Sequence, residues 1–334
     1  MSKITLKDIS TKINVSTNTV SKALRGAPGV SEELRKKICT LAEEMGYKKI
    51  SQDEDDTING ITVLCRDTFL SDVTFWSQVL YGISGYASQN KIKLSIVSID
   101  ETKEDNPETL SAIMSHLSDG FIIAGTISDT LLKKVQTSNI PFVVVDHFSE
   151  EIECDYVNIS NKHGIYKLLK HLYTKGHRNI GFISNSISAY SFIERYEAYL
   201  KYMKEFNLTV REEYLWMEAE YIKTDYFKSK IKSNINNKDF PSAWICVNDN
   251  TALTLIKALK EMNMSVPEDI SVVGFDNIPE LLYSELTTID VPKQSIGQKA
   301  VESLIYRIQN PNSPYADIML STQLIERTSV KDIS

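Results

Sequence analysis

The chain has 334 residues and a formal net charge of −7, from 37 Lys or Arg residues and 44 Asp or Glu residues. This length is sufficient for two or three domains with their own hydrophobic cores. No apolar run approaches the about 20 residues that a membrane-spanning helix needs, and residues 1–9 are too polar for a secretory signal. We therefore expect a cytoplasmic protein that has no membrane partner.

The cysteines and histidines show no metal-binding pattern. The four cysteines are isolated in the sequence: Cys39, Cys65, Cys154 and Cys246. Single cysteines of this kind are typical of small buried apolar residues in a reducing compartment. His171 and His177 lie near each other, but no cysteine joins them at a zinc spacing. We expect structural roles for all six residues, and neither a metal nor a cofactor.

Charge is distributed unevenly along the chain. Residues 1–50 hold ten cations and five anions, a balance of +5, whereas the remaining residues carry −12. A small basic region on an acidic body is the asymmetry expected of a protein that binds nucleic acid.

The basic region begins with a short helix. Thr5 and Asp8 have the spacing of a capping box, in which each side chain bonds the other residue's backbone N–H. Leu6, Ile9 and Ile13 then recur at helical spacing and predict one apolar face. Asn14 marks the end of this helix.

A second short helix follows, with Ser16 as its N-cap. Its apolar residues Val20, Ala23 and Leu24 share one face, and its other faces carry amides, hydroxyls and two cations without a carboxylate. Such groups suit the major groove of DNA, where amides and hydroxyls read base edges and cations meet guanine or phosphate. We expect DNA contacts from Thr5, Ser16, Thr17, Asn18, Thr19, Ser21, Lys22 and Arg25. On this pattern alone, a helical hairpin with a solvated outer face remains the alternative.

A third helix and a linker complete the N-terminal part. Ser31 caps a helix that Gly46 ends, so three helices form a compact head over residues 1–47. Residues 48–57, KKISQDEDDT, have no periodicity and include a run of four carboxylates. This composition predicts a linker.

From residue 58 onward, short apolar runs alternate with helical segments. The runs predict strands at 61–64, 94–99, 121–124, 142–145, 180–184, 243–247 and 271–275. Helices are expected at 74–89, 109–117, 130–138, 163–175, 192–206 and 251–262. This alternation predicts an α/β fold with two doubly wound parallel sheets, each covered by helices on both faces.

Two such lobes form a ligand cleft where the strand ends converge. Polar side chains directly after strands are therefore the candidate cleft residues: Asp67, Asp146, Asn248, Asp249 and Asp276. Carboxylates and amides at these places suit a hydroxyl-rich ligand, although Asx residues also cap helices at such positions.

Several motifs match a known family in order and spacing. They include TLKDIS, VSTNTVSKAL, GVSEELRKKICTLAEEMGY, IPFVVVDH, WICVNDNTALTLIKALK and VPEDISVVGFDNIP. On these motifs the chain resembles the LacI/GalR family of bacterial transcription regulators, nearly from end to end. The resemblance implies a helix-turn-helix head and a two-lobed core like the periplasmic sugar-binding proteins. It also implies a homodimer that binds a pseudo-palindromic operator, and a small effector, such as a sugar or sugar phosphate, that changes operator affinity.

The resemblance also assigns regions and residues. It places the first lobe at 58–159 and 290–320, the second lobe at 160–289 and 321–334, and dimer contacts on the helices at 75–86 and 296–308. The base-reading positions fall on Thr17, Asn18 and Lys22. The effector positions fall on Asp146, Arg195, Asn248 and Asp276, with the aromatic pair Phe75 and Trp76 beside the cleft. For Arg195 the alternative is a helix-surface cation, and for the aromatic pair it is core packing.

The match fails in the linker. The family follows its Gly-Tyr with Pro-Asn and a hinge helix that kinks operator DNA, whereas Gly46 and Tyr47 precede the acidic run here. We expect the hinge helix not to form and operator bending to be weak.

Other classes of function remain as alternatives. The chain lacks a nucleophile elbow, a phosphate-loop lysine motif and a dinucleotide fingerprint, so we expect no enzyme. A regulator controlled by a protein partner stays open. So does a cytoplasmic carbohydrate sensor that binds DNA weakly because its hinge is missing.

Overall fold

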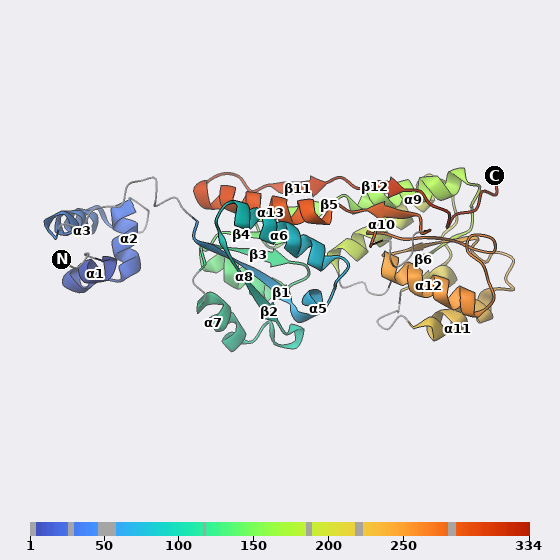
Figure 1. Cartoon of the computed structure of the whole chain (residues 1–334), viewed down its shortest axis with the longest axis horizontal. Coiled ribbons are helices and arrows are strands. Elements are labelled where there is room, and N and C mark those ends of the chain that lie inside the picture. Colours follow the sequence, from blue (N-terminus) through green and yellow to red (C-terminus); the bar gives the residue numbers. More distant parts are fainter. Residues whose placement is uncertain are drawn as a thin grey trace. The chain divides into compact units, whose positions relative to one another are not determined.

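The structure is a computed structural model that describes residues 5–25, 30–45, 58–115, 118–184, 189–217, 223–279 and 285–334. The chain divides into two compact units, Met1–Thr57 and Ile58–Ser334 (Figure 1). The expected linker at 48–57, and with it the expectation about the hinge helix, lies outside the described residues.

The first unit, the head, contains the three helices that the sequence predicts: α1 (Leu6–Ile13), α2 (Thr17–Arg25) and α3 (Glu32–Glu44). The capping box of α1 is present, with both the Thr5 and Asp8 side chains bonded to the partner's backbone. Ile9, Val20 and Ile38, one from each helix, are fully buried together. Helices this short are marginal alone, so this shared core stabilises all three.

The first lobe of the second unit is built on a parallel six-stranded sheet. Its strands, in spatial order, are β11 (Asp317–Leu320), β5 (Asp155–Ile159), β4 (Phe142–Val145), β3 (Gly120–Ala124), β1 (Gly60–Arg66) and β2 (Lys93–Ile99). Helices α6 (Trp76–Gln89) and α13 (Lys293–Gln309) pack in the core on one face. Helices α7 (Pro107–Ser115) and α8 (Asp129–Thr137) pack in the core on the other. Two short helices, α5 (Asp67–Leu70) and η1 (Glu101–Lys103), follow strands β1 and β2.

Helices α6 and α13 lie against each other (Figure 1). Glycines allow this close approach, because a Cβ on Gly82 would lie 2.1 Å from the Gln294 carbonyl oxygen. The apolar stripe of α13, including Ile296 and Leu304, is buried in the lobe's own core. Dimer contacts on these two helices therefore remain a prediction for their outer faces.

The second lobe has a parallel four-stranded sheet in the order β7 (Leu215–Trp216), β6 (Ile180–Ile183), β8 (Ala243–Cys246) and β9 (Ser271–Val273). Helices α9 (Asn161–Thr174) and α10 (Tyr190–Glu205) cover one face. Helices α11 (Thr224–Asn234) and α12 (Asp249–Glu261) cover the other. The lobe also includes the short helix η2 (Glu212–Tyr214) before β7.

The chain passes between the lobes three times: from β5 to α9, from β10 (Thr288–Asp290) to α13, and from β11 to β12 (Gln323–Ile325). Strands β10 and β12 form a separate antiparallel pair. The predicted fold class is confirmed, with two parallel sheets covered by helices on both faces. Within the described ranges, no helix is both long and apolar enough to cross a membrane.

Some elements were not predicted from the sequence: strands β5, β7, β10, β11 and β12, and helix α11. Strand β5 shows the physical reason. It carries Asp155, which is 3% exposed and binds Arg307 of α13 at 2.7 and 3.0 Å. Asp155 and Arg307 are 152 positions apart in the sequence, so the residues around Asp155 show no sign of the pairing that allows this charge to be buried in a strand.

Candidate functional site

A cavity of about 380 Å³ lies between the two lobes of the second unit. The first lobe contributes Arg66, Thr68, Phe69, Asp72, Phe75, Trp76, Glu101, Gly125, Thr126 and Asp146. The second lobe contributes Ala189, Ser191, Phe192, Arg195, Asn248, Asn250 and Asp276. The lining therefore combines aromatic rings with several charged side chains, the composition of a small-molecule site.

Arg195 lies at the centre of the second lobe's wall. Its side chain extends from α10, is 2% exposed and stacks its guanidinium on the Phe275 ring at 3.7 Å. It donates hydrogen bonds of 2.8 Å to Asn161 Oδ1 and to the Val247 carbonyl oxygen. It also forms an ion pair with Asp276 at 3.3 Å. These contacts exclude the alternative in which Arg195 is a helix-surface cation.

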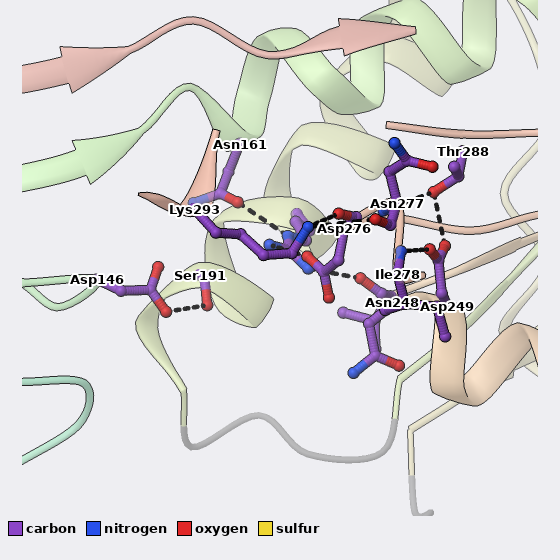
Figure 2. Close-up of polar contacts among 12 residues, drawn as sticks. Asp146, Asn161, Ser191, Asn248, Asp249, Asp276, Asn277, Ile278, Thr288 and Lys293 are labelled. Carbon is purple, nitrogen blue, oxygen red and sulfur yellow. Dashed lines mark hydrogen bonds and ion pairs between the residues drawn. The ribbon is translucent and has the colours of Figure 1, made fainter. Parts of the chain in front are cut away.

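Asp276 is held in an unusual backbone conformation. Asp276 and Asn277 have φ of 107° and 50°, a region that favours glycine, and such strain often accompanies functional sites. Lys293, at the start of α13, bonds the carbonyl oxygens of both residues and is 8% exposed (Figure 2). Burial raises the pKa of the Asp276 carboxyl. Its Oδ1 has no hydrogen-bond partner beyond the ion contact with Arg195.

Asn248 directly precedes α12, and Asp249 is the first residue of that helix. Asn248 lines the cavity and is also the N-cap of α12, since its Oδ1 accepts from Thr251 N at 2.9 Å. Asp249 lies behind the wall and is 1% exposed, with hydrogen bonds from Thr288 at 2.6 Å and from Ile278 N at 2.9 Å (Figure 2). Burial raises the pKa of Asp249 to about 7, and the charge of Asp276 adds to this effect. Asp249 therefore organises the loop that carries Asp276.

Asp146 belongs to the first lobe and follows β4. Its φ is 53°, so it too has a left-handed backbone. Its Oδ2 accepts a hydrogen bond of 3.3 Å from Ser191 of the opposite lobe (Figure 2). Burial raises the pKa of Asp146 to about 7, although the charge of Arg195 lowers it.

The predicted aromatic pair lies on the cavity wall and in the core at once. Phe75 and Trp76 are 8% and 7% exposed and line the cavity. Phe69 stacks on Trp76 with a centroid distance of 4.8 Å and an interplanar angle of 12°. Because both residues also join the hydrophobic core of the first lobe, ligand contact and core packing are compatible here.

Asp67 directly follows the first strand, as predicted, but does not line the cavity. Strand β1 extends to Arg66, and Asp67 begins α5 as an exposed residue that is absent from the cavity lining. Its neighbour Arg66 lines the cavity instead and binds Glu101 at 2.6 Å and Glu104 at 2.9 Å. The effector role predicted for Asp67 is therefore not supported by its position.

Sequence reasoning missed several polar residues of this site, among them Arg66, Glu104, Asn161 and Lys293. Their partners lie between 16 and 38 residues away along the chain. No local pattern signals such pairs. Within the described part of the chain, no group of three or more His, Cys, Asp or Glu side chains is placed to hold a metal ion.

The side-chain hydroxyls that we expect to contact DNA divide into two groups. Those of Thr5 and Ser16 act as helix caps, with Ser16 Oγ accepting from Thr19 N at 3.0 Å. Thr17, at the start of α2, is exposed, and Ser21 is half-buried.

The other expected DNA contacts, Asn18, Lys22 and Arg25, lie on α2, but their side chains are outside the described set. Helix α2 has no acidic residue in its first turn. Its exposed N-terminal part therefore keeps the chemistry expected of a recognition helix.

Known proteins resemble the chain over nearly its full length. Residues 5–49 match the family described as bacterial regulatory proteins, lacI family, and residues 169–330 match the periplasmic binding protein-like domain. The ribose operon repressor of Haemophilus influenzae is 27% identical over 98% of both chains.

Solved structures show the same fold. The lac repressor dimer bound to operator and an anti-inducer is 21% identical, with a TM-score of 0.69 over 99% of this chain and 100% of that one. A LacI family regulator from Enterococcus faecium with bound ribose is 23% identical, with a TM-score of 0.70 over 83% of this chain and 100% of that one.

Head and core together define a ligand-responsive DNA-binding regulator, in which a helix-turn-helix unit is joined to a two-lobed binding core. The chain resembles the lacI family of bacterial regulatory proteins through its head, at residues 5–49, and resembles the ribose operon repressor nearly from end to end.

Proposed function

We propose that the chain is a transcriptional repressor whose affinity for operator DNA is changed by a hydroxyl-rich small molecule, such as a sugar, in the cavity between the lobes. The observation that carries this proposal is the cavity itself, with Arg195, Asp276 and Asp146 on its walls. A guanidinium and carboxylates supply the donors and acceptors that sugar hydroxyls need. The name of the ribose operon repressor and the ribose-bound structure support the same class of ligand.

The head supplies the DNA-binding half of the proposal. Helix α2 presents Thr17 at its exposed N-terminal end, next to Asn18 in the sequence. Hydroxyls and amides at this end of a recognition helix contact base edges in the major groove. We therefore assign base reading to Thr17, Asn18 and Lys22.

In this proposal, the cavity supplies the control of DNA binding. Each lobe contributes one central carboxylate, Asp146 from the first and Asp276 from the second. A ligand that bonds both favours the arrangement in which the lobes are close, and the free energy of that preference is available to change DNA binding. On this account the chain catalyses no reaction and acts in the cytoplasm.

We further propose a homodimer. Exposed apolar side chains occur at the end of α5, between α5 and α6, on α6 and on edge strand β2: Leu70 at 45%, Val73 at 74%, Tyr81 at 67% and Ile96 at 47% exposure. Apolar side chains on one lobe's surface suit a protein interface. In the related lac repressor structure the protein is a dimer on its operator. Tyr81→Glu should convert the dimer to a monomer in sedimentation velocity experiments.

The test is to select DNA duplexes from a random library with the purified full chain. Affinity for the selected duplex is then measured by fluorescence anisotropy with and without a panel of sugars. We expect one sugar to change the affinity about tenfold, which corresponds to about 1.4 kcal/mol of coupling. A chain that selects no duplex at low salt would contradict the proposal.

Matched variants localise the DNA contact. Thr17→Ala should weaken binding to the selected duplex about fivefold, since one base contact contributes about 1 kcal/mol or more. Thr40→Ala is the control, because Thr40 is an exposed threonine on α3 of the same head. Equal losses for the two variants would contradict the assignment of α2.

A further inference from the structure

The charged side chains around the cavity are mostly acidic. Of the described residues, two line it with guanidinium groups, Arg66 and Arg195, whereas four do so with carboxyl groups, Asp72, Glu101, Asp146 and Asp276. A buried Glu104, 5% exposed, stands directly behind Arg66. A ligand entering this space therefore meets more carboxyl groups than guanidinium groups.

Arg66 is already neutralised within the first lobe. Its Nε and Nη2 donate to Glu104 at 3.1 and 2.9 Å, and its Nη1 donates to Glu101 at 2.6 Å. A phosphate binds an arginine best through two parallel hydrogen bonds from the guanidinium. At Arg66, the N–H groups that could bind a phosphate through two parallel hydrogen bonds already donate to carboxylates.

Arg195 is engaged in the same manner within the second lobe. Its Nε and Nη1 bond Asn161 and the Val247 carbonyl oxygen, and its Nη2 faces Asp276. The nearest further cation, Lys293, is bound to backbone carbonyl oxygens. Among the described residues, no cation of the cavity is left without an acceptor for an anionic ligand.

The carboxylates are less completely paired than the cations. Within the described ranges, the carboxyl group of Asp146 has one hydrogen bond, from Ser191 at 3.3 Å, and takes part in no ion pair. Asp276 is 7% exposed and lines the cavity, and its Oδ1 has no hydrogen bond but is in ion contact with Arg195 at 3.3 Å. The rings of Phe75, Trp76 and Phe192 are also on the wall, and aromatic faces attract cations.

We propose that the cavity selects its ligand by charge. It binds a hydroxylated compound that carries an amino group, such as an amino sugar, more tightly than the neutral analogue, and it excludes the phosphorylated form. Asp146 is the residue that sets this preference, because it is the central carboxylate without a cationic partner. This inference rests on the proposed function of the cavity as the effector site, and it narrows the expected ligand by excluding sugar phosphates.

The physical basis is the cost of burying charge. An anion placed beside unneutralised carboxylates loses its hydration and gains repulsion. An ammonium group at Asp146 instead gains an ion pair in a place that water reaches poorly, where charges interact more strongly than in bulk solvent.

The test compares matched sets of sugars by isothermal titration calorimetry with the full chain. Each set holds a neutral sugar, its amino derivative and its phosphate: glucose, glucosamine and glucose 6-phosphate, and the same three forms of galactose, mannose and ribose. Within the set that binds, we expect the amino sugar to bind about tenfold more tightly than the neutral sugar. The phosphate should not bind at millimolar concentration.

Asp146→Asn tests the residue. We expect the ratio of the Kd of the neutral sugar to the Kd of the amino sugar to fall to about one, because the amide keeps the size of the side chain and removes its charge. Glu150→Gln is the matched control. It removes a carboxylate that is exposed four residues further along the same loop and that does not line the cavity.

The possible results separate the two claims. A phosphate that binds as tightly as its neutral sugar overturns the charge preference and leaves the proposed function intact. An amino sugar that keeps its advantage in Asp146→Asn overturns the role of Asp146. If no sugar in any form binds the wild-type chain, both the proposed function and this inference fail.

Discussion

The two lobes hold their central carboxylates in different ways. Asp276 of the second lobe is bonded through its side chain to Arg195 and through its backbone to Lys293. Among the described residues, the side chain of Asp146 in the first lobe has a single hydrogen bond, from Ser191 across the cavity at 3.3 Å. The difference indicates that the Asp276 carboxyl of the second lobe is held in place before a ligand binds, whereas the Asp146 carboxyl of the first lobe gains its remaining contacts from the ligand. Preorganised groups of this kind save the ordering cost of binding.

The largest expected effect is the loss of Arg195. Arg195→Met leaves the buried carboxyl of Asp276 without its cation, and breaking a buried pair costs about 3–5 kcal/mol. We expect the urea midpoint of unfolding to fall accordingly, and ligand binding to be lost. Arg211→Met is the control, since Arg211 binds Asp239 at 3.0 Å and is 31% exposed. Such surface pairs contribute about 1 kcal/mol at most, so equal effects of the two substitutions would refute an organised second wall.

Lys293→Met is the next test of that wall. Its ammonium bonds the carbonyl oxygens of Asp276 and Asn277, and hydrogen bonds to charged groups contribute about 1.5–3 kcal/mol. We expect a loss of about 2 kcal/mol in the free energy of unfolding and about tenfold weaker ligand binding. Lys299→Met on the same helix, which breaks a half-exposed pair with Glu302, should do neither. Unchanged ligand affinity in Lys293→Met would show that the Asp276 loop does not need this support.

Asp146 should make stability depend on pH. Its pKa is raised from 3.8 to about 7 by burial, so the folded protein holds a proton that the unfolded chain releases above about pH 4. Its contribution to stability is therefore greatest below pH 4 and is lost as pH rises to about 7. Asp146→Asn should stabilise the ligand-free chain by about 1 kcal/mol or more at pH 8 and by less at pH 5. Urea unfolding at both values measures this difference, and a gain that is the same at pH 5 and pH 8 would contradict the assignment.

The smallest effect is expected at a second contact across the cavity. Asn250 donates to Thr74 Oγ1 at 3.4 Å, near the limit of a hydrogen bond, and Asn250 is exposed. Asn250→Ala should change ligand affinity by less than about twofold, since an exposed and long hydrogen bond contributes little. A larger change, measured by calorimetry, would show that the first lobe's side of the cavity is held more firmly than the single hydrogen bond of the Asp146 side chain indicates.

The general position of the cavity could be predicted from sequence because it depends on a rule about parallel sheets. Their carboxyl ends converge, and the residues after those ends include Asp146, Asn248 and Asp276, which the structure places on the cavity lining. Asp67 also directly follows a strand, but it begins α5 as an exposed residue and does not line the cavity, so the rule identifies candidate positions and not the direction of each side chain.

The charge pairs of the cavity could not be predicted. Arg66 meets Glu101 and Glu104 at separations of 35 and 38 residues, and no spacing rule joins residues that far apart. Arg195 was identified through the family motif, because its position on α10 alone is equally consistent with the helix surface. Side chains that act through distant partners are thus visible only in the folded chain.

Trp76 gives the molecule an optical reporter of its own. It lies on the cavity wall with one ring face stacked on Phe69, whereas the other two tryptophans, Trp216 and Trp244, are buried together in the second lobe with their rings 4.0 Å apart. Occupation of the cavity should alter the fluorescence of Trp76 and leave that of the other pair as a constant background. Effector candidates can therefore be screened by emission intensity in unlabelled protein, before any operator sequence is known.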